Sequence, residues 1–155
     1  MVFWICMAAG LPLNLLVFAG GEFAMLGAML GGLAIIAGLV SLYMLHYQLW
    51  KLIPVDIARS TPGKAVGFCF IPFYNFYWYF IAWKGLGEDM TKTLQRHGIQ
   101  HQINEALGLT VCILAISCFI PFLGQLLYIA WAVVMFFFLK SIKDGAIALI
   151  EKGGA

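Results

Sequence analysis

Charged residues are scarce in this chain. Asp, Glu, Lys and Arg make up 10% of its 155 residues, whereas 63% are hydrophobic and the mean hydropathy is +0.95. Soluble domains contain about 25% charged and about 45–50% apolar residues. The composition therefore argues against a water-soluble fold. It predicts an all-α integral membrane protein in one domain, 1–155, with room for about four or five helices of about 20 residues.

Metal-binding cysteine patterns are also missing. The sequence has no CxxC and no pairing of Cys with His at the spacing of a zinc site, and its four cysteines lie in apolar runs. His97 and His101 are four residues apart, but Gly98 weakens a helix between them and no carboxylate or cysteine completes a ligand set. We therefore expect a solvated histidine pair and no metal site.

No Asp, Glu, Lys or Arg lies deep within an expected span, although ionisable residues there usually mark ion and proton pathways in membranes. Glu88 and Lys92 have the spacing of an ordinary surface pair on a helix. No nucleophile and base arrangement, phosphate-cradling glycine loop or nucleic-acid-binding module is visible in the sequence. We expect no enzymatic activity and no nucleic-acid partner, and a small pore or transporter is only the third hypothesis for the function.

One pentapeptide, Cys-Phe-Ile-Pro-Phe, occurs twice, at Cys69–Phe73 and at Cys118–Phe122. An Ile-Ala-Trp triplet follows each copy. A proline within an apolar run breaks or kinks a helix. The repeat therefore predicts two hydrophobic hairpins with their apexes at Pro72 and Pro121.

The two hairpins have arms of unequal length. The arm from Ala65 to Pro72 would reach only about 12 Å as a helix, well short of the ~30 Å hydrocarbon core. Aromatic residues that favour the membrane–water interface follow it: Tyr74, Tyr77, Trp78 and Trp83. We predict four transmembrane helices, at about 2–20, 23–50, 107–120 and 124–150, plus one re-entrant or interfacial aromatic hairpin within 65–90.

The distribution of positive charge favours this topology over its alternative, five transmembrane helices with Ala65–Lys84 spanning. Five spans would place three basic residues opposite the other six, whereas the re-entrant hairpin places all nine on one side. Lys and Arg concentrate on the cytoplasmic side of membrane proteins. Both termini are then expected in the cytoplasm. Because residues 1–20 lack a positively charged leader, we interpret them as a retained membrane helix.

Small residues line one face of the expected helix 23–50. In a bilayer, small residues let two helix backbones approach closely, which drives helix association. This face predicts packing on the first helix or on a partner protein, and the alternative is a glycine-rich composition without a specific interface. The residues of the expected interface are Gly20, Ala24, Gly27, Ala28, Gly31 and Gly32.

His46 lies near the end of the same helix, beside Tyr43, Tyr47 and Trp50. A histidine in an apolar helix is suited to bind haem or a chlorin as an axial ligand, but the sequence indicates no second axial residue. The alternative is an anchor at the level of the lipid headgroups. No cofactor is strongly implied apart from lipid, and a visible absorption spectrum of the purified protein would separate the two interpretations.

The segment Arg59–Met90 resembles part of a family of uncharacterised bacterial multi-pass membrane proteins, some of which carry a GYF-like domain. The similarity rests on Thr61–Phe68, Phe70–Phe73, Asn75–Trp78 and Gly85-Leu86. It covers about a fifth of the chain. The resemblance implies a bacterial membrane protein, expected in the inner membrane, and it implies no activity.

Together these patterns predict a non-catalytic accessory or scaffold subunit of a membrane protein complex. Its expected partners are the lipid bilayer and other integral membrane proteins. The alternative is a cofactor-associated subunit of an electron-transfer or photosynthetic assembly, with His46 near the pigment or haem.

Overall fold

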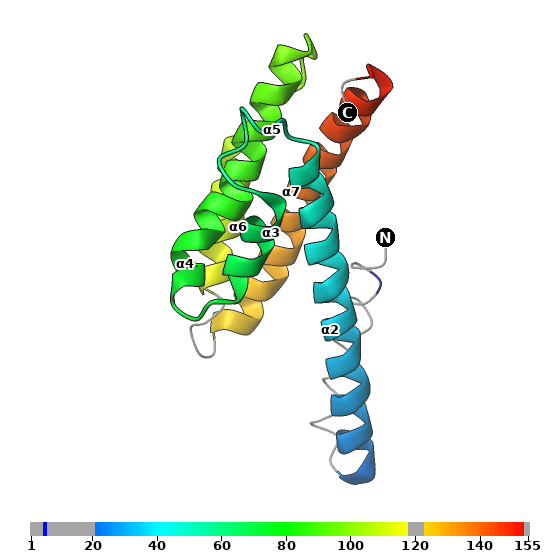
Figure 1. Cartoon of the computed structure of the whole chain (residues 1–155). Coiled ribbons are helices and arrows are strands. Elements are labelled where there is room, and N and C mark those ends of the chain that lie inside the picture. Colours follow the sequence, from blue (N-terminus) through cyan, green and yellow to red (C-terminus); the bar gives the residue numbers. More distant parts are fainter. Residues whose placement is uncertain (1–4, 6–20, 118–122, 154–155) are drawn as a thin grey trace. The chain divides into compact units, whose positions relative to one another are not determined.

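The computed structural model of the chain describes Ile5, residues 21–117 and residues 123–153. Every regular element in these residues is a helix (Figure 1), so the predicted all-α class is confirmed for them. Apart from Ile5, the expected helix 2–20 lies outside the described residues. Gly20 and the expected apex at Pro121 lie outside them as well.

Contacts within the chain divide it into two units, residues 1–46 and residues 47–155. The described part of the first unit is dominated by one helix, α2, which runs from Gly21 to Lys51 and ends in the second unit. The second unit contains the last turn of α2 and all later helices.

Helix α2 is a long, apolar helix of 31 residues, which corresponds to about 46 Å. It begins at Gly21, whose φ of 67° suits glycine better than any other residue. It ends where Leu52 and Ile53 donate backbone hydrogen bonds to Leu49 and Trp50, just before a proline that cannot continue the helix.

One helix in the described part of the chain, Ala24–Lys51, is long and apolar enough to cross a membrane. Helix α6, Glu105–Ser117, is apolar but has only 13 residues. Helix α7, Leu123–Glu151, has 29 residues, but charged residues follow its apolar part from Lys140 onward. The structure therefore supports one of the four expected spans, by length and composition.

After the last turn of α2, a connector of residues 52–61 leads into a helical hairpin. Helix α3, Pro62–Gly67, begins after Thr61, whose side chain accepts a hydrogen bond from the Lys64 N–H. A single turn of 3₁₀-helix, η2, follows at Phe68–Phe70. The chain then turns at residues 71–73, where Phe73 has a φ of 63°. A non-glycine residue rarely adopts this conformation, so the turn carries local strain.

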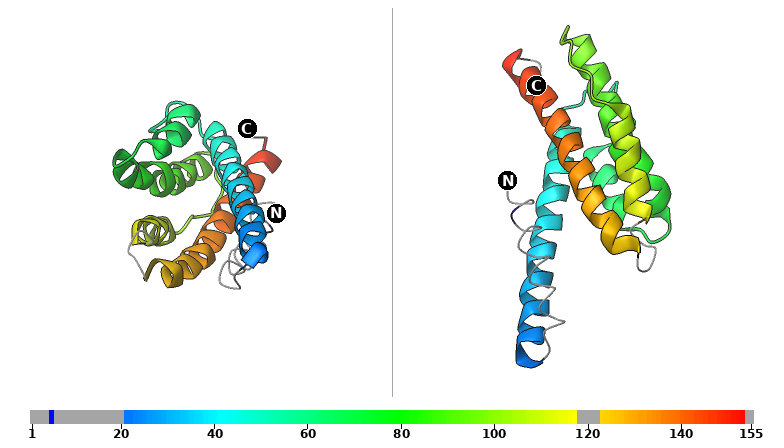
Figure 2. Two further views of the ribbon diagram at one scale, coloured as in Figure 1. Left: turned by 90° about the horizontal axis from the view of Figure 1, so that it is seen from below. Right: turned by 180° about the vertical axis from the view of Figure 1, so that it is seen from behind.

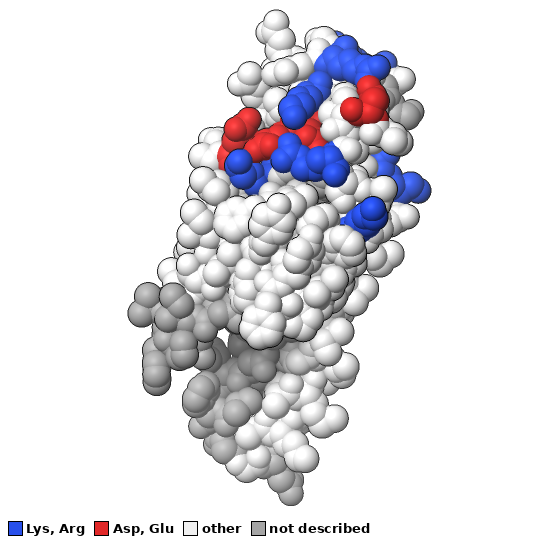
Figure 3. Space-filling model, turned by 60° about the vertical axis from the view of Figure 1, so that its left-hand side comes forward, with Lys and Arg blue, Asp and Glu red and all other residues white. Residues whose placement is uncertain are grey.

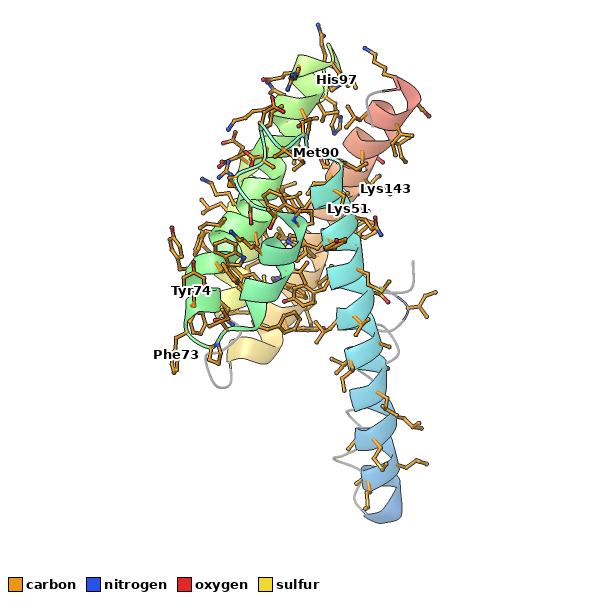
Figure 4. All side chains as sticks on the ribbon, in the orientation of Figure 1. Lys51, Phe73, Tyr74, Met90, His97 and Lys143 are labelled. Atoms are coloured by element: carbon orange, nitrogen blue, oxygen red, sulfur yellow. The ribbon has the colours of Figure 1, made fainter. Side chains whose placement is uncertain are left out.

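The second arm of the hairpin is much longer than the first. It consists of helix α4, Tyr74–Tyr79, a π-helical turn, η3, at Phe80–Lys84, and helix α5, Gly85–Arg96. The indole N–H of Trp78 donates a hydrogen bond of 3.2 Å to the carbonyl of Ala65, which joins the two arms. Figure 4 shows Phe73 and Tyr74 at one end of the second unit and His97, just after α5, at the other.

Helices α5, α6 and α7 pack against one another in the second unit (Figure 2). Gly108 in α6 allows this close approach, because a Cβ atom there would lie 3.2 Å from both Lys84 Cα and Phe138 Cε2. Phe138 itself is fully buried. The core around it contains Leu86, Met90, Leu94, Val111, Met135, Ile142 and Leu149.

Candidate functional site

An ion-pair cluster joins the connector after α2 to helix α5. Arg59 binds Asp89 through three hydrogen bonds: its backbone N–H and Nε reach Oδ2 at 3.0 Å, and Nη2 reaches Oδ1 at 2.7 Å. Nη2 also contacts Glu88 at 2.5 Å, and Lys84 binds the other oxygen of Glu88 at 2.8 Å. Asp89 is 1% exposed, whereas the Arg59 side chain is 34% exposed. The cluster thus has a buried carboxylate at its centre and a basic side chain toward its outside.

The pKa values of the cluster follow from these contacts. Burial raises the pKa of Asp89, but the hydrogen bonds and the charge of Arg59 outweigh it, so the pKa is lowered overall. The hydrogen bond from Lys84, together with Arg59, lowers the pKa of Glu88. The bond to Asp89 raises the pKa of Arg59. All three groups are therefore charged at neutral pH, as the ion pairs require.

Gly85, the first residue of α5, makes room for the arginine. A Cβ atom at this position would lie 2.8 Å from Arg59 Cδ, which is closer than van der Waals contact allows. Figure 3 shows acidic and basic side chains gathered together on this face of the molecule.

A pocket of about 480 Å³ lies beside the cluster, between the connector and the α3–α4 hairpin. Basic, aromatic and aliphatic side chains line it together, and it belongs wholly to the second unit. The lining residues are Trp50, Lys51, Ile53, Val55, Ala58, Arg59, Ser60, Thr61, Pro62, Lys64, Phe68 and Trp78.

Comparisons with models of protein families, with curated proteins and with solved structures found no match. The resemblance of Arg59–Met90 to bacterial membrane proteins therefore stays a prediction.

The small residues expected to form a helix interface lie on two sides of α2. Gly27 and Gly31 are buried, whereas Ala28 is exposed and Ala24 and Gly32 are half-buried. A Cβ atom at Gly32 would have no neighbour within 4 Å. The structure therefore separates a covered row of glycines from an adjacent open row at Ala28 and Gly32.

The expected interfacial aromatics also divide into two pairs. Tyr74 and Tyr77 are exposed, whereas Trp78 and Trp83 are buried inside the second unit. Tyr74 and Trp78 stack with their ring centroids 5.7 Å apart, next to Phe68. The two tryptophans are therefore part of the buried core. The two tyrosines are exposed near the turn at Pro72, which is itself exposed.

The three histidines of the chain lie in three different surroundings. His46 is fully buried near the end of α2 and does not line the pocket described above. His97 Nδ1 lies 2.9 Å from the Thr93 carbonyl at the end of α5, and His101 Nε2 lies 3.0 Å from the Ser141 carbonyl. His97 and His101 are both half-buried, and each lies against a different backbone carbonyl. In the described residues, no group of three or more His, Cys, Asp or Glu side chains could hold a metal ion.

The Arg59–Asp89 pair was not predicted from the sequence, which suggested a pair between Glu88 and Lys92 instead. That local prediction is wrong: Glu88 pairs with Lys84 and Arg59, and Lys92 lies 3.5 Å from Asp89. Arg59 and Asp89 are 30 residues apart, so no periodic pattern connects them. The sequence signal that could have indicated a buried ion pair was the two adjacent carboxylates, Glu88 and Asp89, in a chain with only seven Asp and Glu residues.

Proposed function

We propose that this chain is a small, non-catalytic subunit of a membrane protein complex, in which it serves as an accessory or scaffold component. The observation that carries the proposal is the exposed apolar surface of α2. Soluble monomers rarely expose a continuous apolar surface of this kind, and such surfaces mark contacts with lipid or with other proteins.

Large apolar side chains are exposed along most of α2. Met25 is 68% exposed, and Met29 and Leu33 are each 62% exposed. Similar side chains continue along the helix as Leu26, Leu30, Ile36, Leu39, Val40, Met44 and Leu45. No Asp, Glu, Lys or Arg interrupts residues 23–50. A bilayer would solvate these side chains.

The open row at Ala28 and Gly32 is the proposed contact for a partner helix. Apolar side chains gain little by leaving lipid tails, so helices associate in membranes through small residues and close backbone packing. Ala28 and Gly32 are four residues apart and therefore lie on one side of the helix. Because nothing contacts the position of a Cβ at Gly32, this row is open to a neighbour.

The charge distribution supports the proposed topology. All nine Lys and Arg residues lie between Lys51 and Lys152, outside the uncharged segments 65–83 and 106–139. The first of these segments contains the turn at Pro72. We propose that the uncharged segments face the bilayer and that both termini are cytoplasmic, in a bacterial inner membrane.

The test is the size of the assembly extracted from the native membrane. We expect the wild-type protein, purified in a mild detergent, to elute in an assembly well above its own 17.1 kDa, measured by light scattering with the detergent mass subtracted. Replacing both Ala28 and Gly32 by Leu should release the chain as a monomer. The added side chains would block a partner helix without a clash at Gly32.

Ala37→Leu is the matched control. Ala37 is exposed on the same helix, but lies about 140° around the helix axis from Gly32. This variant should keep the wild-type assembly. A monodisperse wild-type monomer, or equal loss of the assembly in both variants, would overturn the proposed contact.

A further inference from the structure

The pocket beside the ion-pair cluster has an excess of positive charge. Lys51, Arg59 and Lys64 line it, and its lining contains no carboxylate. Arg59 is compensated by Asp89 and Glu88, which bind it from outside the pocket. In the described part of the chain, by contrast, neither Lys51 nor Lys64 forms an ion pair. Two exposed lysine charges are therefore available to an anion.

The rest of the pocket is apolar. Trp50 and Trp78 donate their indole N–H groups to the carbonyls of Ala82 and Ala65, so their polar edges are already satisfied within the protein. Phe68 packs edge-on against Trp78, with the ring centroids 4.8 Å apart. These rings, with Ile53 and Val55, offer the pocket an apolar wall. The lining thus suits a ligand with both an anionic and an apolar part.

The position of the pocket in the chain narrows the class of ligand. Lys51 is the last residue of the apolar span Ala24–Lys51, and the connector that forms the pocket follows it directly. In a bilayer, the end of such a span lies at the level of the headgroups. A phospholipid has its phosphate at this level and its acyl chains just below.

We propose that this pocket binds an anionic phospholipid. Lys51 and Lys64 hold the phosphate as point charges, as lysines commonly do. Phe68 and Val55 contact the glycerol and the first part of the acyl chains, whereas Trp50 and Trp78 are almost fully buried. Basic pockets beside membrane helices bind anionic headgroups by the same combination. The pocket shares no residue with the open row of α2 and does not depend on the partner proposed there.

Native mass spectrometry of the full chain in detergent tests the proposal. The probes are dioleoylphosphatidylglycerol, which is anionic, and dioleoylphosphatidylcholine, which is neutral overall. The wild-type protein should bind the anionic lipid at least about fivefold more tightly. The double variant K51Q/K64Q should lose this preference, whereas K51R/K64R, which keeps both charges, should retain most of it.

The control K140Q/K143Q removes the same amount of charge from two exposed lysines of α7 that do not line the pocket. It should bind both lipids as the wild type does. A wild-type protein without lipid preference would overturn the proposal, and so would equal losses in the two glutamine variants. Inorganic phosphate added at 10 mM should leave the lipid bound; displacement by it would overturn the assignment to a lipid in favour of a free anion.

Discussion

Asp89 is the residue on which the ion-pair cluster depends. It accepts hydrogen bonds from the backbone and from two side-chain nitrogens of Arg59, and it is nearly inaccessible to solvent. A buried carboxylate is stable only when it is paired and hydrogen-bonded. The same three bonds hold the connector against α5. The Asp89 side chain therefore both neutralises Arg59 and attaches the connector to α5.

Asp89→Asn should therefore destabilise the protein. Removing one partner of a buried pair costs about 3–5 kcal/mol, and because Arg59 is one-third exposed we expect about 2 kcal/mol here. The measurement is thermal unfolding in detergent, followed by tryptophan fluorescence. Asp56→Asn is the control, since Asp56 and Arg96 form an exposed pair, 63% and 56% exposed, that should contribute under about 0.5 kcal/mol. Equal effects of the two substitutions would contradict the assignment.

The cluster also predicts how stability depends on pH. Folding lowers the pKa of Asp89 and of Glu88 below their ordinary values of 3.8 and 4.5. Their contribution is therefore complete above pH of about 4.5 and is lost as the pH falls through the lower pKa values of the folded protein. The unfolding temperature of the wild type should fall steeply below pH 4, and that of the double variant E88Q/D89N less steeply. Parallel pH profiles would show that other carboxyl groups dominate.

At the scale of the elements, glycines decide how closely the helices of the second unit pack. A Cβ atom at Gly108 would press on the backbone of Lys84, and one at Gly145 would lie 2.9 Å from Leu94 Cδ1. A side-chain end can move away from such a contact, but a helix backbone moves only with its neighbours. Gly108 is therefore the less replaceable of the two.

Gly108→Ala should lower the stability by about 1–3 kcal/mol, the usual cost of overpacking a core. Gly67→Ala is the matched control. Gly67 has helical φ and ψ angles, and a Cβ atom there would have no neighbour within 4 Å, so alanine should be neutral or stabilise by up to about 1 kcal/mol. Thermal unfolding in detergent measures both. A neutral Gly108→Ala would mean that α6 can shift away from η3.

The helical class and the approximate bounds of α2, α6 and α7 could be predicted from the sequence, because long apolar runs bounded by polar residues have few other solutions in a bilayer. The sequence did not predict that helical structure continues without a break from Tyr74 to Arg96. From the sequence, Glu88 and Lys92 suggested only a local pair on a surface helix. In the structure α5 continues through them because ion pairs with Arg59 and Lys84 satisfy its polar face.

The candidate site was harder to predict than the elements. Trp78 was expected at the membrane interface from its residue type, but its indole bond to Ala65 places it inside the hairpin. The pocket at Lys51 and Lys64 depends on how the connector folds back, and no spacing rule describes such a return. Both features arise from contacts between residues far apart in the sequence.

For the whole molecule, the topology can be tested by labelling single cysteines in a cysteine-free background. Ser60→Cys lies before the hairpin, and Gln95→Cys lies near the end of its second arm, where Gln95 is an exposed residue of α5. A membrane-impermeant maleimide should label both in inverted vesicles, whose outer surface is the cytoplasmic side, and neither in intact cells. Phe73→Cys, at a position that is 86% exposed in the protein, should be protected by lipid. Labelling of Ser60→Cys and Gln95→Cys from opposite sides would show that the segment between them spans the membrane.

In the proposed membrane topology, the uneven distribution of charge between the two units has a consequence for insertion during synthesis. Residues 1–46 contain no Lys or Arg, and Glu22 is their one charged side chain. Within residues 1–64, the first cation that could select the orientation of α2 is therefore its own last residue, Lys51, and Arg59 and Lys64 follow it. Since basic residues near the end of a span set its direction, the same connector that forms the pocket would also orient the helix that precedes it.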